Sequence, residues 1–229
     1  MSIPGPNILA AAIKEDVRYA KGRFLDSGAS GILEILPCGD LIKSPWPGKS
    51  GKDSRRDITT EYAIYRKLGR HARLIRIFDW DLQDCALTME YMPNGNLQAF
   101  LLVKNDTVAE IQRLRWVQEA AEGNFLLDEH LGLKIADFGG SSLAGSRPSA
   151  CSGQRFSLPG KCWRDPPTVQ DDLFALGTTI YFIMTCGRNY RNHRFPDISQ
   201  IVCGEFIKRC WSSQITSAQE IYDFIRSIV

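Results

Sequence analysis

The hydrophobic pattern is mainly that of strands in the first part of the chain and mainly that of helices in the second, and this difference limits the possible folds more than any other feature. Before the segment 93–96, apolar residues alternate with polar ones, as in half-buried β-strands. After it, they recur every three or four residues, as in amphipathic helices. The segment itself, Pro-Asn-Gly-Asn, is typical of a break between elements. The sequence therefore predicts an α+β fold with a β-rich first part and a mainly helical second part.

The first part is expected to contain five strands and one helix. Residues 23–45 predict three consecutive antiparallel strands, joined by a glycine-rich turn and a Pro-Cys-Gly-Asp turn. A polar, glycine-containing loop is expected to follow at 46–57. Next comes a helix that ends at Leu68, with Asp57 or Thr59 as its N-cap. Two further strands are predicted within 74–92.

The second part is expected to be mostly helical. A short helix is predicted at 96–102 and a longer amphipathic helix at 107–123, followed by a small hairpin at 125–137. The stretch 171–187 is apolar almost all round, which is typical of a buried helix. The tail, 199–229, predicts two amphipathic helices.

Composition narrows the class of partner. The chain has 229 residues and a net charge of +2, which is too small to indicate a nucleic acid or a membrane surface as partner. The apolar run near the N-terminus is too short for a signal peptide or a membrane span. Seven cysteines without Cys-x-x-Cys pairs do not resemble a disulfide framework. We therefore expect a monomer in the cytoplasm or nucleus.

Small residues and opposite charges in the first part suggest a phosphate site. Gly28 and Gly31, in Asp-Ser-Gly-Ala-Ser-Gly-Ile-Leu, would let backbone N–H groups approach phosphate oxygens, although a simple hairpin turn fits equally well. Lys43 follows at the end of a strand and Glu61 lies on the next helix. Such residues are more often solvated surface charges when taken singly, so their order carries the argument.

Two motifs near the middle of the chain suggest a ligand-binding segment and a metal site. Met-Glu-Tyr-Met-Pro-Asn-Gly-Asn-Leu, 89–97, is compatible with a ligand-binding segment or with a plain edge strand and turn. Asn124 and Asp137 flank the predicted hairpin, and Asp137 begins an Asp-Phe-Gly triplet. An amide oxygen and a carboxylate are hard ligands of the kind that Mg²⁺ prefers.

These motifs occur in the order used by protein kinases, and residues 23–229 resemble a eukaryotic protein kinase domain, most closely a fungal serine/threonine or tyrosine kinase-like one. The resemblance implies a bilobal fold with an N-terminal extension at 1–22, an N-lobe at 23–92 and a truncated C-lobe at 93–229. It implies ATP and Mg²⁺ as cofactors, with Asn124 and Asp137 at the metal. The residues that it assigns to ATP are Gly28, Gly31, Leu33, Lys43, Glu61, Met89, Glu90 and Met92.

The chain departs from the family at one decisive point. Kinases carry a His-Arg-Asp catalytic loop before the metal-binding asparagine, and here Gly123 is followed at once by Asn124. The aspartate that accepts the substrate proton is missing, and Asp128, Glu119 and Glu122 are poorly placed to replace it. The resemblance thus implies the class that transfers the ATP γ-phosphoryl to protein serine or threonine, with activity impaired in this chain.

Three hypotheses remain open at this stage. The chain is an incomplete form of an active kinase that acts on a protein substrate, or a pseudokinase that binds nucleotide and serves as a binding or scaffold module. The third hypothesis is an unrelated α+β protein with accidental motifs.

Overall fold

The structure is a computed structural model that describes residues 20–120, 125–143, 148–149, 156–162, 165–187 and 195–228. The chain divides into two compact units. Unit 1 consists of Met1–Gly69, Arg76–Tyr91 and Phe138–Gly140, and unit 2 of Arg70–Ile75, Met92–Asp137 and Ser141–Val229. The expected N-terminal extension lies outside the described residues up to residue 19.

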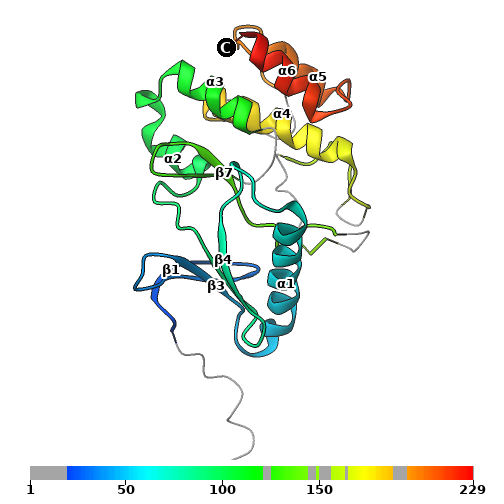
Figure 1. Ribbon diagram of the computed structural model, residues 1–229. Helices are drawn as coiled ribbons and strands as arrows, with labels where there is room; N and C mark the ends of the chain where they lie inside the picture. Colours follow the sequence, from blue (N-terminus) through cyan, green and yellow to red (C-terminus); the bar gives the residue numbers. More distant parts are fainter. Residues whose placement is uncertain are drawn as a thin grey trace, which may run out of the picture. The chain divides into compact units, whose positions relative to one another are not determined.

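An antiparallel sheet forms the larger part of unit 1 (Figure 1). Its strands, in the order in which they pair, are β1 (Arg23–Gly28), β2 (Gly31–Ile35), β3 (Leu41–Ser44), β5 (Ala86–Met89) and β4 (Ile77–Asp81). The three consecutive strands and the later pair predicted from the alternating pattern are therefore confirmed. Short turns join β1 to β2, β2 to β3 and β4 to β5, as expected for antiparallel neighbours, whereas a helix lies between β3 and β4 in the chain.

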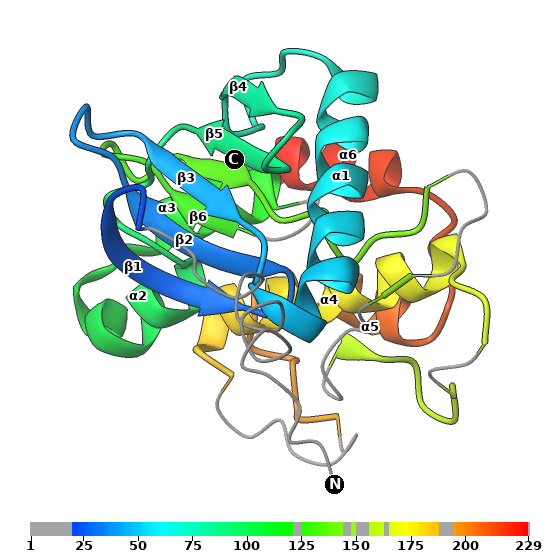
Figure 2. The ribbon, with the colours of Figure 1, turned by 90° about the horizontal axis from the view of Figure 1, so that it is seen from below.

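One helix, α1 (Gly51–Leu68), lies beside this sheet, as Figures 1 and 2 show from two directions. It follows the short 3₁₀ turn η1 (Gly48–Ser50), so the polar loop expected at 46–57 is largely helical. The expected N-caps were also wrong, because Asp57 and Thr59 lie inside the helix. The core-facing positions of the first turns are Gly51 and Ser54, which give no hydrophobic signal that a sequence pattern could reveal.

Unit 2 is mainly helical. Its elements are α2 (Leu97–Lys104), η2 (Asn105–Thr107), α3 (Glu110–Glu119), β6 (Phe125–Leu127), β7 (Leu133–Ile135), α4 (Val169–Thr185), α5 (Gly204–Trp211) and α6 (Ala218–Ile228). The strands β6 and β7 pair as the predicted hairpin. Together with the β-rich unit 1, this composition confirms the α+β, kinase-like fold class.

The helix α4 forms the core of unit 2. Eight of its residues are buried, as its apolar sequence predicted. It begins in a capping box, in which Thr168 accepts a hydrogen bond from Asp171 N–H and Asp171 accepts one from Thr168 N–H. It packs closely on α5, since a Cβ at Gly177 would lie 2.4 Å from Cβ of Cys210. The indole of Trp211 donates to the Thr178 hydroxyl at 3.0 Å and joins the same core.

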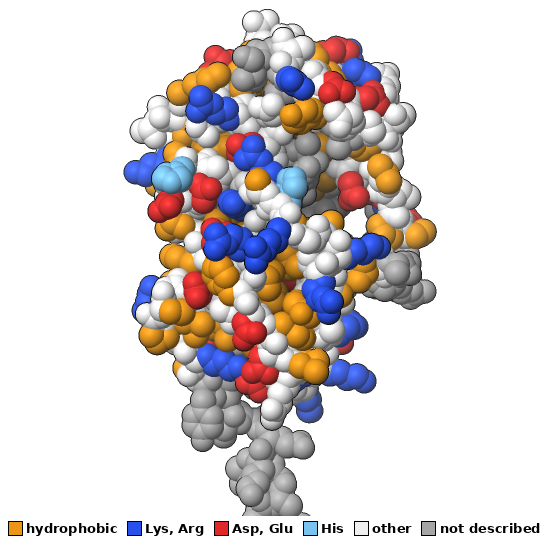
Figure 3. Space-filling model, viewed as in Figure 1, with side chains coloured by type: hydrophobic (Ala, Val, Ile, Leu, Met, Phe, Trp, Pro, Cys, Tyr) orange, Lys and Arg blue, Asp and Glu red, His pale blue; other side chains and the backbone are white. Residues whose placement is uncertain are grey.

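The surface is chemically mixed. On the face shown in Figure 3, Lys and Arg side chains are interspersed with acidic and apolar ones, as expected for a net charge of +2. In the part of the chain that the structure describes, no helix combines the length and the apolar character that crossing a bilayer requires.

Candidate functional site

Lys43 and Glu61 form a buried ion pair in unit 1. Lys43 lies on β3 and Glu61 on α1, and Lys43 Nζ is 2.7 Å from Glu61 Oε2. The two side chains are only 6% and 1% exposed. Each of these two buried charges is compensated by the other, so loss of either partner leaves an uncompensated buried charge and destabilises the fold. The pair therefore fixes the position of a cation on the face of the sheet that α1 covers.

The spacing of α1 explains why Glu61 reaches the sheet. The buried residues Ile58, Glu61 and Tyr65 are three and four positions apart, so they lie on one face of the helix. One turn after Glu61, the ring of Tyr65 meets the ring of Phe138 edge to face, with centroids 5.1 Å apart. Phe138 belongs to the Asp-Phe-Gly triplet and also to unit 1. Nothing in the sequence alone indicated this aromatic contact.

The glycine-rich turn between β1 and β2 is a tight hairpin, in which Gly28 pairs with Gly31. Gly31 has a φ of +155°, and a Cβ there would lie 2.4 Å from the carbonyl oxygen of Ser44. Glycine is therefore required at this position by close packing on β3. By contrast, a Cβ at Gly28 would meet no atom within 4 Å. Leu33 follows on β2, directly opposite Lys43 in the register of the sheet.

The residues expected beside adenine lie where β5 ends. Met89 is buried on β5 and pairs with Leu41 of β3. The N–H of Glu90 donates to Arg76 O at 2.9 Å, and the Glu90 carboxylate accepts from Arg76 N–H at 3.2 Å. Met92 is buried in unit 2, where its carbonyl accepts from Gly95 N–H at 3.1 Å. The structure thus brings Met89 and Glu90 into unit 1, and Met92 into unit 2.

Asp137 follows the hairpin of unit 2 with an unusual backbone. Its φ is +62°, a left-handed conformation that costs a non-glycine residue about 1–3 kcal/mol and that clusters at functional sites. The strand that leads to it, β7, pairs with β6 on one side and meets the segment 73–75 on the other. There Ile135 N–H donates to Arg73 O at 2.6 Å. Asn124, the second expected metal ligand, lies outside the described residues.

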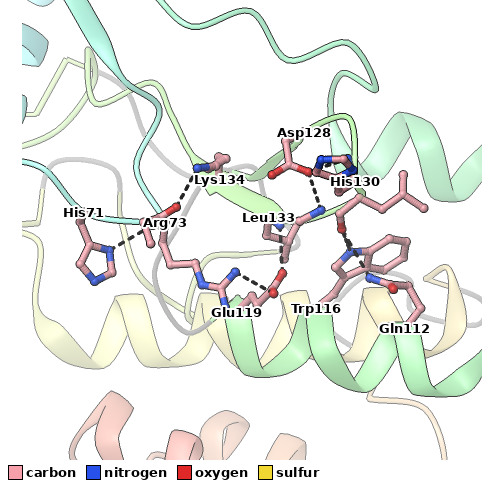
Figure 4. A network of polar contacts seen from close by, with 12 residues as sticks. His71, Arg73, Gln112, Trp116, Glu119, Asp128, His130, Leu133 and Lys134 are labelled. Atoms are coloured by element: carbon pink, nitrogen blue, oxygen red, sulfur yellow. Dashed lines mark hydrogen bonds and ion pairs between the residues drawn. The ribbon is translucent and has the colours of Figure 1, made fainter.

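The helix α3 anchors this hairpin through one of its faces (Figure 4). Trp116 Nε1 donates to Leu131 O at 2.7 Å, and Glu119 Oε2 accepts from Leu133 N–H at 2.9 Å. Glu119 Oε1 also lies 2.7 Å from the guanidinium of Arg73. Because Trp116 and Glu119 are three positions apart, they lie on one face of α3 and hold the tip of the hairpin and the start of β7. Sequence reasoning missed this network, since none of its members forms a local motif.

Among the described residues near the Gly123–Asn124 junction, the acidic groups Glu119 and Asp128 both have hydrogen-bond partners in unit 2. Glu119 is engaged by Arg73 and Leu133, as just described. Asp128 accepts hydrogen bonds from the N–H groups of His130 and Gly132, at 2.9 and 2.8 Å, and so closes the turn between β6 and β7 (Figure 4). The residues 121–124, which include the Gly123–Asn124 junction, lie outside the described residues.

Comparison with known proteins points to one family. A family model described as protein tyrosine and serine/threonine kinase matches residues 41–129, a range that includes Lys43 and Glu61 and ends before Asp137. The chain is 27% identical over 188 residues to the carbon catabolite-derepressing protein kinase of Saccharomyces cerevisiae. The matched region covers 71% of this chain and 27% of the relative. These findings support a protein kinase domain.

Two further relatives agree. The serine/threonine-protein kinase Nek8 of Danio rerio is 24% identical over 219 residues, covering 82% of this chain and 31% of the relative. The putative L-type lectin-domain containing receptor kinase V.2 of Arabidopsis thaliana is 26% identical over 214 residues, covering 80% of this chain and 31% of the relative. The chain thus spans less than a third of the length of each of these three relatives.

Proposed function

We propose that this protein kinase-like domain binds ATP through unit 1, with Lys43 as the cation for the phosphates, and that it transfers the γ-phosphoryl poorly. The observation that carries the proposal is the buried Lys43–Glu61 pair at 2.7 Å. A lysine that is held this firmly can face phosphate oxygens without losing its orientation, because Glu61 restricts its rotamers.

The residues of unit 1 fit a nucleotide. A Cβ at Gly28 would meet no atom within 4 Å, so a phosphate could approach the backbone N–H groups of the turn from that side. Leu33 is only partly buried and lies opposite Lys43, which suits an apolar contact with an adenine ring. Met89 and the backbone of Glu90 would complete the adenine contacts by resemblance to the family.

Magnesium fits the chemistry of Asp137. Among the described residues no group of three His, Cys, Asp or Glu is placed to hold a metal. That is compatible with Mg²⁺, which usually takes one or two protein ligands and completes its shell with water and substrate phosphates. When bound, the ion would neutralise phosphate charge. Asp137 supplies a carboxylate on a constrained backbone, and Asn124 is the second proposed ligand.

Poor transfer follows from the missing catalytic loop. The sequence has no His-Arg-Asp triplet, and a positioned general base typically contributes about 10²–10⁴-fold to a rate. Among the described residues, Glu119 and Asp128 are the acidic groups nearest to the Gly123–Asn124 junction along the chain, and each already binds the β6–β7 hairpin. We therefore infer a nucleotide-binding module that acts on or with a protein partner, rather than an efficient enzyme.

An incomplete chain is the second candidate. It is favoured by the direct Gly123–Asn124 junction and by relatives whose names describe protein kinases. Under this hypothesis the full protein transfers phosphate to serine or threonine. Reading the messenger RNA across the junction decides it: codons for a catalytic loop establish the incomplete chain, and an uninterrupted junction supports the pseudokinase.

A transfer assay tests the proposal on the protein itself. The purified chain is incubated with magnesium and γ-³²P-labelled ATP, with casein as a general serine/threonine substrate, and nucleotide binding is followed in parallel by thermal shift. We expect Mg-ATP to raise the melting temperature, because a ligand that binds the folded state stabilises it, while label incorporation stays near background. A melting temperature unaffected by Mg-ATP contradicts nucleotide binding, and rapid labelling contradicts the impairment.

A further inference from the structure

A buried hydroxyl ties the glycine-rich turn to the start of α1. Ser54 is 1% exposed, and its Oγ donates to the carbonyl oxygen of Ser30 at 3.0 Å. Ser54 Oγ also accepts a hydrogen bond from Trp46 N–H at 2.9 Å. A serine hydroxyl has one donor and can accept twice, so Ser54 is used in both directions. Ser54, on α1, is therefore hydrogen-bonded both to the turn and to Trp46, which lies two residues beyond the end of β3.

Trp46 holds the other end of the same turn. Its indole Nε1–H donates to the carbonyl oxygen of Gly28 at 2.9 Å. Trp46 is itself packed tightly on the helix, since a Cβ at Gly51 would lie 2.8 Å from Trp46 O. The carbonyls of Gly28 and Ser30 thus have fixed partners on either side of the turn. We call Trp46 and Ser54 the loop anchor.

By fixing the Gly28 carbonyl, the loop anchor also fixes the direction of the next N–H group in the turn. In a trans peptide unit, the C=O and N–H groups point in opposite directions. Fixing Gly28 O against Trp46 therefore directs the N–H of Ala29 away from Trp46. A turn that is already ordered also loses less conformational entropy when a ligand binds to it.

We propose that Trp46 and Ser54 are positioning residues for phosphate recognition by the Gly28–Gly31 turn. The proposal rests on the proposed nucleotide binding by unit 1 and deepens it, because it names what orders the turn. The loop anchor acts on the phosphate-bearing part of the ligand, so it strengthens the binding of ADP and ATP and leaves that of adenosine unchanged.

The test compares two ligands and three variants by isothermal titration calorimetry. Trp46→Phe keeps an aromatic ring and removes the donor, Ser54→Ala removes the hydroxyl, and Thr59→Ala is the matched control. The Thr59 hydroxyl lies on the same helix and donates to Arg55 O at 2.7 Å, away from the turn. Each variant is titrated with Mg-ADP and with adenosine, and its melting temperature is measured without ligand.

The expected result is a lower ratio of Mg-ADP affinity to adenosine affinity in the loop-anchor variants. Trp46→Phe loses one hydrogen bond of the loop anchor and Ser54→Ala loses two, and each variant should bind Mg-ADP about three- to tenfold more weakly, with adenosine affinity and Thr59→Ala unaffected. Equal weakening of both ligands, or no weakening of either, overturns the positioning role. If Ser54→Ala is too unstable to titrate, Trp46→Phe alone decides the result, because Trp46 is partly exposed. Wild-type protein that binds neither ligand overturns the proposed function as well, and so distinguishes the two failures.

Discussion

The Lys43–Glu61 pair of unit 1 and the Asp137 end of the hairpin in unit 2 reach their geometry by different means. The pair is fixed by side chains, through burial and one contact of 2.7 Å. Asp137 is fixed by its backbone, which follows a strand held on both edges and by α3. A single substitution can therefore destroy the first arrangement. The second depends on several contacts, most of them between main-chain groups, so no single substitution removes all of them.

The largest loss of stability is expected from breaking the Lys43–Glu61 ion pair. Lys43→Met leaves the Glu61 carboxylate buried without its partner and should lower the free energy of unfolding by about 3–5 kcal/mol, measured by urea denaturation. The double variant Lys43→Met/Glu61→Leu replaces both charges by apolar groups and should recover most of this loss. A single variant within about 1 kcal/mol of wild type contradicts the account of unit 1.

A smaller effect is expected where the hairpin is held by α3. Glu119→Ala leaves the N–H of Leu133 without its side-chain acceptor and should cost about 1–3 kcal/mol in unfolding free energy. Arg73→Ala should cost at most about 1 kcal/mol, since the Arg73 side chain is 39% exposed and its charge is screened by solvent. If Arg73→Ala proves the more damaging of the two in urea denaturation, the ion pair rather than the main-chain contact holds the hairpin.

The backbone of Asp137 offers a direct comparison of two variants. Both Asp137→Gly and Asp137→Ala lose the carboxylate, but only alanine retains a Cβ at a φ of +62°. The glycine variant should therefore be more stable by about 1–2 kcal/mol, as judged from thermal unfolding. Equal stability would show that the left-handed conformation carries no strain.

The smallest expected effect is a difference in cysteine reactivity, which reports on whether reagents reach the buried core of unit 2. Burial raises the pKa of Cys203 to about 11 and that of Cys210 to about 12. At pH 8 the thiolate fraction of Cys203 is then about one thousandth, whereas Cys38 and Cys162 are exposed. We expect iodoacetamide to label Cys38 and Cys162 first, as followed by peptide mass spectrometry. Because a raised pKa disfavours the thiolate, labelling of Cys203 should speed up as the pH rises. Early labelling of Cys203 or Cys210 at pH 8 would indicate an open core.

Local patterns predicted much of the fold and part of the candidate site. Alternation along 23–45 identified three strands, and the apolar stretch at 171–187 identified the buried helix α4. The start of α1 was wrong because Gly51 and Ser54 face the core there, and small or polar residues leave no hydrophobic period.

Long-range contacts lay beyond the reach of the sequence. Lys43 and Glu61 could be matched by their order along the chain, although their contact was only an expectation before the structure. The bond from Trp46 to Gly28 and the link from Glu119 to Arg73 join residues whose spacing follows no local rule. Such contacts depend on how strands and helices pack, which single-sequence patterns do not encode.

Titration of the wild-type chain with Mg-ATP by isothermal titration calorimetry, beside the Lys43→Met/Glu61→Leu variant, tests the central proposal most directly. An exposed lysine of α1 provides the control, Lys52→Met. We predict saturable one-to-one binding by wild type and Lys52→Met, and binding weakened at least about tenfold in the double variant, because the phosphates lose a fixed cation. Equal affinity in all three proteins, or no binding by the wild type at millimolar ATP, would contradict it.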